Sequence, residues 1–300
     1  MTAVTTPSKT MESKEERSLA GAAAANKRAA VILFIIACAG AVLTLVPFYL
    51  MLAMSLKTSS EIAENPWALP HAAQWINYAR TWKIEGTDVT FAAFFKNTLT
   101  IAVLTTLGTT LSSALVAFGF ARLRFPGRDR LFVLLLSTMM LPGIVTMIPS
   151  YIGFRYLSWI DTLYPLIVPS FFAGAFNVFL LRQFFMTLPR ELDEAALIDG
   201  ASYFQIFWRV LLPLTKPALV TVGLFAFIGS WKDLMGPLIY LNSTQHQTLE
   251  LGLRTFQTIR GTEWNLLMAG SVIVLIPLLI LFFVGQRYFV QGIVMSGLKD

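Results

Sequence analysis

Long runs without any charged residue constrain this chain more strongly than any other feature of its sequence. The run from Ala29 to Leu56 is 28 residues long, and similar runs cover residues 97–121, 131–154, 162–181 and 264–286. At 1.5 Å per residue, each run is long enough to cross a hydrocarbon core of about 30 Å as a helix. Backbone groups need internal hydrogen bonds in lipid, so these runs predict transmembrane helices.

A further apolar stretch begins near Pro217 and is interrupted only by Lys232 and Asp233. It brings the expected number of spans to six. The whole chain is 56% hydrophobic and 13% charged, outside the usual range of soluble proteins. The sequence therefore predicts an all-α integral membrane protein. We place its transmembrane domain at residues 29–289, with spans at about 29–56, 97–121, 131–154, 162–181, 217–240 and 264–286.

Polar segments flank this domain at both ends. Residues 1–28 are small and polar, and we expect them to form a disordered tail. A basic start before an apolar run is also typical of a signal peptide, but the run at 29–56 is too long for one, which favours an uncleaved first span. Residues 290–300 are predicted to form a second tail.

Basic residues are distributed unequally between the two sides of the membrane. With the N-terminus inside, the predicted cytoplasmic segments hold 15 Lys and Arg residues, and the opposite segments hold 8. The densest cluster lies between Arg122 and Arg130, in a short loop where the positive-inside rule acts most strongly. Both termini are therefore predicted to be cytoplasmic. This distribution explains the net charge of +6 without a nucleic-acid partner.

The cytoplasmic interval at residues 187–217 has the composition of a docking element. Acidic residues crowd the start of a predicted short helix at 191–198, where the helix dipole favours them, and Gly200 is expected to end it. Ala195, Ala196 and Gly200 have little side chain, so another protein can approach their backbone closely, and Glu194 adds one charge. From these properties alone, an amphipathic loop lying on the lipid surface is the alternative.

The spacing within this interval resembles the EAA loop of ABC-importer permeases. Three residues separate Glu194-Ala195-Ala196 from Gly200, and nine more precede Val210, where the family usually has Ile. Asp199 and Ala201 match the version found in sugar importers. The resemblance assigns ATPase coupling to Glu194, Ala195, Ala196, Asp199, Gly200, Ala201, Val210, Leu212 and Pro213.

The resemblance extends from about Ser55 to the C-terminus, and it is strongest to the maltose-type G permease subunit of the binding-protein-dependent, carbohydrate-uptake family. It implies a type I importer fold in the bacterial cytoplasmic (inner) membrane. The implied partners are a sister permease, an ABC ATPase dimer that uses ATP and Mg²⁺, an extracytoplasmic solute-binding protein, membrane lipid and a small solute such as a carbohydrate. Polyols and glycerol phosphates remain alternative solutes.

Trp231, Lys232 and Asp233 are the candidate residues for the pathway or gate. Charges within a span usually face a cavity, which favours a polar passage, while snorkelling of Lys232 to the outer interface is the alternative. The family usually has Trp-Asn-Asp/Glu here, so Trp231 and Asp233 match and Lys232 departs. This departure weakens any transfer of solute preference from relatives.

Other chemistries have little support in the sequence. It has no GxxxxGK[ST] phosphate loop, so we expect no ATP to bind this chain through one. Its two histidines and one cysteine are too few for a metal cluster built from these residues, and no catalytic residue is assigned. An ion-coupled secondary transporter is a weaker alternative, because clear inverted repeats and acidic residues at mid-membrane are lacking.

Overall fold

The computed structural model describes the backbone of residues 9–83, 89–258 and 261–297, and the side chains of residues 29–83, 89–257 and 261–286. Most of these residues are helical. The longer helices are α1 (Lys9–Ser55), α4 (Phe91–Arg122), α5 (Arg128–Ser137), α6 (Gly143–Tyr156), α8 (Ala175–Thr187), α12 (Lys216–Trp231) and α15 (Trp264–Gly297). Shorter helices connect them: α2 (Ser59–Glu64), α3 (Ile76–Thr81), α7 (Tyr164–Ile167), α9 (Glu191–Ile198), α10 (Tyr203–Gln205), α11 (Leu212–Leu214), α13 (Met235–Tyr240) and α14 (Leu249–Leu253). Strands β1 (Gln257–Thr258) and β2 (Gly261–Thr262) form an antiparallel pair.

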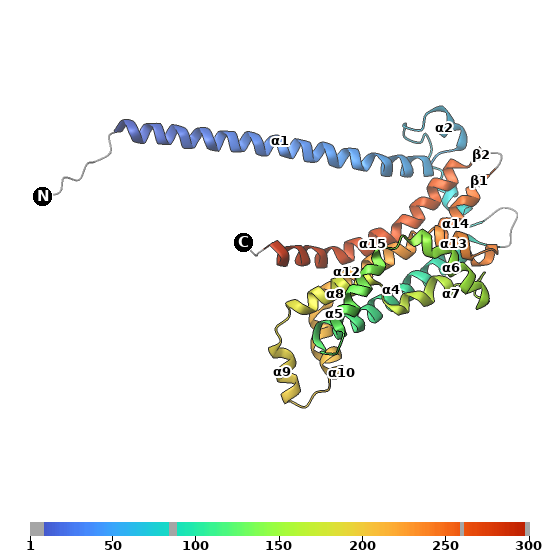
Figure 1. Ribbon diagram of the computed structural model, residues 1–300. Helices are drawn as coiled ribbons and strands as arrows, with labels where there is room; N and C mark the ends of the chain where they lie inside the picture. Colours follow the sequence, from blue (N-terminus) through green and yellow to red (C-terminus); the bar gives the residue numbers. More distant parts are fainter. Residues whose placement is uncertain (1–8, 84–88, 259–260, 298–300) are drawn as a thin grey trace.

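Helix α4 lies at the centre of the bundle, with α8 and α12 packed along it, and α15 packs against α12 (Figure 1). Small residues on α4, including the fully buried Ala102 and Ala114, allow this close packing. At Gly108, an added Cβ would lie only 2.7 Å from the Ser170 hydroxyl and 2.8 Å from the Phe171 ring. The glycine is therefore required for the contact between α4 and the turn before α8.

Two hydrophobic clusters hold the bundle together. The first, which we call the α9-side cluster, has the buried residues Ala114, Ala117, Phe118, Ala121, Phe132, Val178, Leu181, Phe185, Ile206, Phe207, Leu211, Ala218 and Val222. The second, the α14-side cluster, has Phe91, Phe94, Ala102, Trp231, Leu249, Phe256, Leu266, Leu267 and Val274. Each cluster joins helices that are distant in the sequence, so the bundle is fixed near both ends.

Two predicted spans are broken, contrary to the expectation of continuous helices. The stretch at 131–154 divides into α5 and α6, which are bent by 97°. Pro142 disfavours a helical conformation in the residue before it, and Leu141 is accordingly extended. The stretch at 217–240 ends as α12 at Trp231, and α13 begins only at Met235. Lys232 and Asp233 therefore lie in a break and not within one helix.

The span predicted at 162–181 is longer than expected and runs from Tyr164 to Thr187, through α7, a 3₁₀ turn at Val168–Phe172 and α8. It includes Arg182, the charged residue that ends the uncharged run in the sequence. The guanidinium carbon of Arg182 lies 4.1 Å from the centre of the Phe132 ring, and Nε donates to the Phe120 carbonyl oxygen. These contacts compensate the charge within the bundle.

Helix α1 extends away from the bundle and packs mainly against α15 (Figure 1). The structure describes residues 9–28 as part of this helix, where the sequence predicted a disordered tail, and residues 1–8 lie outside the described residues. The alanine-rich stretch at 22–25 has high helix propensity, which explains the continuation. Most of the tail predicted at 290–300 likewise continues α15, to Gly297.

Four helices are long and apolar enough to cross a membrane by themselves. They are Ala29–Ser55, Phe91–Arg122, Tyr164–Thr187 and Trp264–Gln286. Two bent pairs also qualify, so the described residues provide up to six spans if each pair counts as one. The second pair joins residues 203–214 to α12 at an angle of 80°.

Candidate functional site

The candidate coupling segment begins with α9, which projects from one end of the bundle (Figure 1). Glu191, Asp193 and Glu194 lie in its first turn, as the helix dipole favours. None of its eight residues is buried. A short helix without a buried residue gains little from the rest of this chain and is available to a partner.

Gly200 ends α9 through paired backbone hydrogen bonds, which confirms the prediction that the helix stops at this glycine. Its φ of +80° lies in the left-handed region. The Ala201 N–H donates to the Ala196 carbonyl at 2.9 Å, and the Gly200 N–H donates to the Leu197 carbonyl at 3.0 Å. This is the hydrogen-bond pattern of a Schellman motif, in which glycine is the favoured residue at the left-handed position. The turn fixes the direction in which the chain leaves α9.

The second half of the segment is anchored in the bundle. Ser202 and Gln205 form a capping box at the start of α10. A π-helical turn follows at Ile206–Leu211, and Ile206, Phe207 and Leu211 are buried in the α9-side cluster. The turn therefore packs in the same cluster as Ala218 and Val222 of α12.

The nine residues of the EAA-like motif separate into two groups. Glu194, Ala195, Asp199, Gly200 and Pro213 are exposed. The other four, Ala196, Ala201, Val210 and Leu212, are partly buried against the α9-side cluster. The first group is the more available for contact with another protein, while the second group packs the segment against the bundle.

Exposed apolar residues that the sequence analysis missed lie beside the first group. Ile198 is 86% exposed and Phe204 is 67% exposed. The Phe204 and Trp208 rings are stacked, with centroids 6.4 Å apart. Exposed apolar side chains at such a density are typical of an interaction surface.

An ion pair that the sequence analysis also missed joins α9 to α4. Arg122 Nη1 lies 3.4 Å from Asp193 Oδ2, and the two side chains are 3% and 17% exposed. Arg122 Nη2 also donates to the Leu188 carbonyl at 2.9 Å. Burial raises the pKa of Asp193, an effect that attraction to Arg122 and then to Arg190 reduces. Since Arg122 Nε and Asp193 Oδ1 have no hydrogen-bond partner among the described residues, the pair is incompletely satisfied.

The three candidate pathway residues have different environments. Trp231 is fully buried, and its Nε1 donates to the Val274 carbonyl on α15 at 3.1 Å. Its ring stacks on Phe227 and meets Phe95 edge-on. Trp231 therefore packs within the seam between helices. Lys232 is exposed, and the Asp233 carboxylate accepts from the Gly236 N–H at the start of α13.

Glu250 on α14 is a charge near Lys232 that the sequence analysis did not select. Burial raises the pKa of Glu250, and attraction to Lys232 partly offsets this effect. The two residues are far apart in the sequence, so no local pattern connects them. The break after α12 therefore contains Lys232 and Asp233 and has Glu250 nearby, one positive and two acidic groups.

Asp161, Ser243 and His246 converge in loops away from α9. The Ser243 hydroxyl donates directly to Asp161 Oδ2 at 2.7 Å, and the backbone N–H groups of Asn242 and Ser243 donate to Asp161 Oδ1. His246 Nδ1 lies 3.1 Å from the same hydroxyl and 3.4 Å from Asp161 Oδ1. A Ser-His-Asp triad uses the two ring nitrogens separately, whereas one nitrogen faces both partners here. The group therefore joins two loops and does not activate a nucleophile.

A bundle with several helices long and apolar enough to cross a membrane, and with a short exposed helix at one end, is typical of multi-helix integral membrane proteins. Residues 110–295 match the family described as "Binding-protein-dependent transport system inner membrane component". The chain belongs to this family, and it is a permease subunit of an ABC importer. Within the described residues, no group of three or more His, Cys, Asp or Glu could hold a metal ion.

Several curated relatives are similar over most of their length. The arabinooligosaccharides transport system permease protein AraQ of Bacillus subtilis is 35% identical over 86% of this chain and 91% of its own. The probable ABC transporter permease protein YurM of the same organism is 32% identical over 84% of this chain and 83% of its own. The sn-glycerol-3-phosphate transport system permease protein UgpE of Yersinia pestis is 33% identical over 86% of this chain and 93% of its own.

Solved structures support the type I importer permease fold. A chain of a bacterial ABC transporter involved in alginate import matches with a TM-score of 0.79 at 23% identity, covering 88% of this chain and 98% of that one. The MetNI methionine ABC transporter matches with a TM-score of 0.52 at 19% identity, over 66% of this chain and 93% of that one. At these identities the match concerns the fold alone.

Proposed function

We propose that this chain forms, together with a sister permease, the passage for a carbohydrate or related polar solute delivered by an extracytoplasmic solute-binding protein. In this proposal the chain crosses the bacterial inner membrane six times, with both termini in the cytoplasm, over the domain at residues 29–289. The coupling segment at 187–217 then faces the cytoplasm. An arabinooligosaccharide permease and a glycerol-phosphate permease are both relatives, so the proposed class of solute includes oligosaccharides, with polyols and glycerol phosphates as alternatives.

The observation that supports coupling is the contrast within the segment. Helix α9 exposes Glu194, Ala195 and Ile198, while the following turn is buried in the α9-side cluster and leads into α12. We infer that α9 sits in a cleft of a partner ATPase subunit. In this proposal the ATPase pair binds ATP with Mg²⁺ elsewhere, and this chain binds neither. Closure of the ATPase pair would move α9 as a rigid body and change the packing of the helices behind it. This chain supplies no hydrolytic group in this mechanism.

The passage is proposed to run past the break after α12. Lys232 and Asp233 are its candidate residues in this chain, with Glu250 as a third charged group. Trp231 is kept in the proposal as the residue whose packing on α15 fixes where this break begins.

Uptake measurements test the coupling role. We expect Glu194→Lys and Gly200→Leu each to abolish solute uptake driven by ATP while the chain still inserts and assembles. Glu64→Lys, which reverses a charge on an exposed residue of α2, is the control and should transport normally. Undiminished uptake with either α9 variant would contradict the docking role.

A further inference from the structure

A cationic cavity lies beside the coupling segment and has no part in the mechanism proposed above. It has a volume of about 730 Å³ and is lined by Arg124, Phe125, Arg128, Asp129, Arg130 and Arg190, together with Gly127. Four arginines and one aspartate give it a formal charge of +3. In the sequence, the distribution of these arginines indicates only the orientation of the chain in the membrane.

Three of the four arginines have no partner of opposite charge in direct contact. Arg128 Nε pairs with Asp129 Oδ1 at 3.0 Å, which neutralises the one carboxylate in the cavity. The side chains of Arg124 and Arg130 have no hydrogen bond or ion pair to any described residue, and the side chain of Arg190 has only a longer-range attraction to Asp193. By contrast, the bundle arginines Arg122 and Arg182 both have protein partners.

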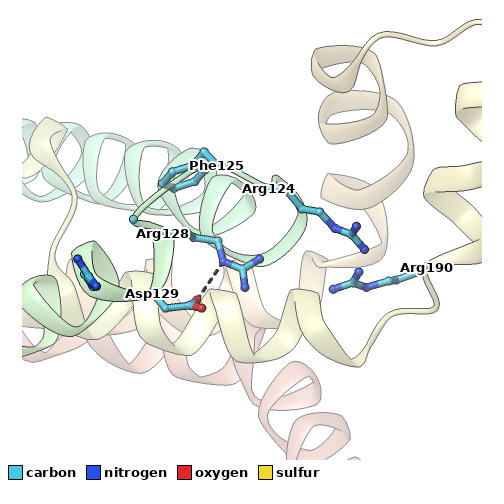
Figure 2. Close-up of a pocket in the computed structure, with 7 residues that line it drawn as sticks. Arg124, Phe125, Arg128, Asp129 and Arg190 are labelled. Carbon is cyan, nitrogen blue, oxygen red and sulfur yellow. Dashed lines mark hydrogen bonds and ion pairs between the residues drawn. The ribbon is translucent and has the colours of Figure 1, made fainter.

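The geometry brings like charges together. Figure 2 shows the Arg124 and Arg190 side chains reaching toward one another from two different segments, the loop after α4 and the start of α9. The N-terminus of α5 opens into the same space, and its N-cap residue, Gly127, provides no side-chain cap. Converging guanidinium groups of this kind are suited to phosphate oxygens, which they bind in a bidentate manner.

An apolar helix face adjoins the cavity. On α5, Leu131, Val133 and Leu134 are 49%, 65% and 63% exposed, and Phe125 in the cavity wall is 38% exposed. Helix α5 belongs to a candidate membrane span, so these side chains lie where acyl chains are found. A ligand with an anionic head and an apolar tail therefore matches the surface better than a free anion.

We propose that the Arg124–Arg190 cavity binds the phosphate headgroup of an anionic phospholipid, whose acyl chains lie along α5. Basic clusters at the ends of spans attract anionic lipid with about 1 kcal/mol per residue. The proposal depends on the proposed function only in placing this end of the bundle at a membrane surface. It requires neither docking of α9 nor any particular solute.

Lipid retention by the purified importer complex tests the proposal. The complex is washed in mixed micelles of phosphatidylglycerol and phosphatidylcholine in equal amounts, and native mass spectrometry then counts the lipids that remain. We expect the wild type to retain phosphatidylglycerol preferentially, and the double variant Arg124→Gln/Arg130→Gln to weaken retention about thirtyfold. The matched control is Arg155→Gln/Arg254→Gln, which removes the same charge outside the cavity and should leave retention unchanged.

Two further arms separate the alternatives. Inorganic phosphate added in excess should not displace the lipid. Displacement of phosphatidylglycerol by phosphate, or equal retention of both lipids by the wild type, would overturn the proposal in favour of a free-anion site. Loss of the ATPase subunits from Arg124→Gln/Arg130→Gln with lipid retention unchanged would show a protein contact and overturn it as well. Each readout is independent of transport, so failure of the coupling proposal would leave the result unaffected.

Discussion

The two ends of the bundle are held in different ways. Near α14, Asn77 is 2% exposed, and its amide donates to the Ser55 and Lys57 carbonyls at 2.9 Å each and accepts from Asn265. Lys57 is 1% exposed, and its ammonium group donates to the carbonyl oxygens of Asn65 and Pro66. Near α9, one incompletely satisfied ion pair joins the projecting helix to α4.

This difference suggests that the α14 end is rigid and that α9 is the part able to move. Buried polar groups that share several hydrogen bonds make an arrangement costly to alter, because opening it leaves several groups unsatisfied. Helix α9 has no buried residue and few contacts to break. The structure therefore favours motion at the α9 end, while the α14 end keeps its geometry.

The largest effect is expected at the fixed end. Trp231→Ala should remove the packing on Phe227 and Phe95 and leave the Val274 carbonyl without its donor, at a cost of about 3–5 kcal/mol in the free energy of unfolding. Thermal unfolding of the detergent-solubilised chain measures this. Trp231→Phe is the control and should lose less. Normal stability of Trp231→Ala combined with altered solute selectivity would mean that Trp231 faces the passage after all.

A double-mutant cycle on Arg122 and Asp193 should give the next largest effect. Arg122→Met leaves the mostly buried carboxylate of Asp193 unpaired, and we expect it to lower the free energy of unfolding by about 2 kcal/mol. This is less than for a fully buried ion pair, because Asp193 is partly exposed. The double variant Arg122→Met/Asp193→Leu should recover much of this loss. Arg209→Met, at an exposed residue of the coupling segment, is the control. Strict additivity of the two single effects would mean that the pair does not hold α9.

Gly200 tests the turn that directs the chain away from α9. Gly200→Val places a β-branched residue at a φ of +80° and should lower the free energy of unfolding by about 1–2 kcal/mol. The cost comes from the backbone conformation, because nothing lies within 4 Å of the added Cβ. Gly200→Asn should be tolerated, because Asn adopts this conformation more readily. Equal stability of the Val and Asn variants would indicate that the turn relaxes to another conformation.

The smallest effect concerns the pH dependence of stability near α2. Hydrogen bonds from the Thr58 N–H, the His71 side chain and the His71 N–H lower the pKa of Glu61 from 4.5 to about 2. The folded state thus favours the ionised carboxylate of Glu61. The stabilisation that this carboxylate provides is fully present above about pH 4.5 and is lost as the pH falls toward 2. Melting temperatures measured over this interval should fall less for Glu61→Gln than for the wild type. Glu64→Gln, on the same helix, should follow the wild type.

Local features of the coupling segment could be predicted from the sequence. Acidic residues at a helix start and a glycine at its end act on their own neighbours, and the observed α9 and its Schellman turn match the prediction. Positions of the apolar runs were likewise predictable, because the hydrocarbon thickness sets their length. The breaks at Pro142 and after Trp231 were missed, although Pro142 provided a local signal for the first.

Contacts between distant residues could not be predicted in the same way. Arg122 was grouped with the loop arginines, whereas it lies in the last turn of α4 and pairs with Asp193 on α9. The separation of the EAA-like motif into exposed and packed residues also depends on how α9 meets the α9-side cluster. One sequence contains no signal for either contact. The assignment of Lys232 and Asp233 to the passage stays a prediction.

Labelling of one engineered cysteine tests the central claim most directly. Ile198 is 86% exposed on α9, and Cys38 is the only cysteine, so Ile198→Cys in a Cys38→Ser background provides a single reactive site. A membrane-impermeant maleimide should modify it in inside-out vesicles and not in right-side-out vesicles, and bound ATPase subunits should protect it. Modification from the outer face, or equal modification with and without the ATPase subunits, would contradict the account of α9 as the coupling helix.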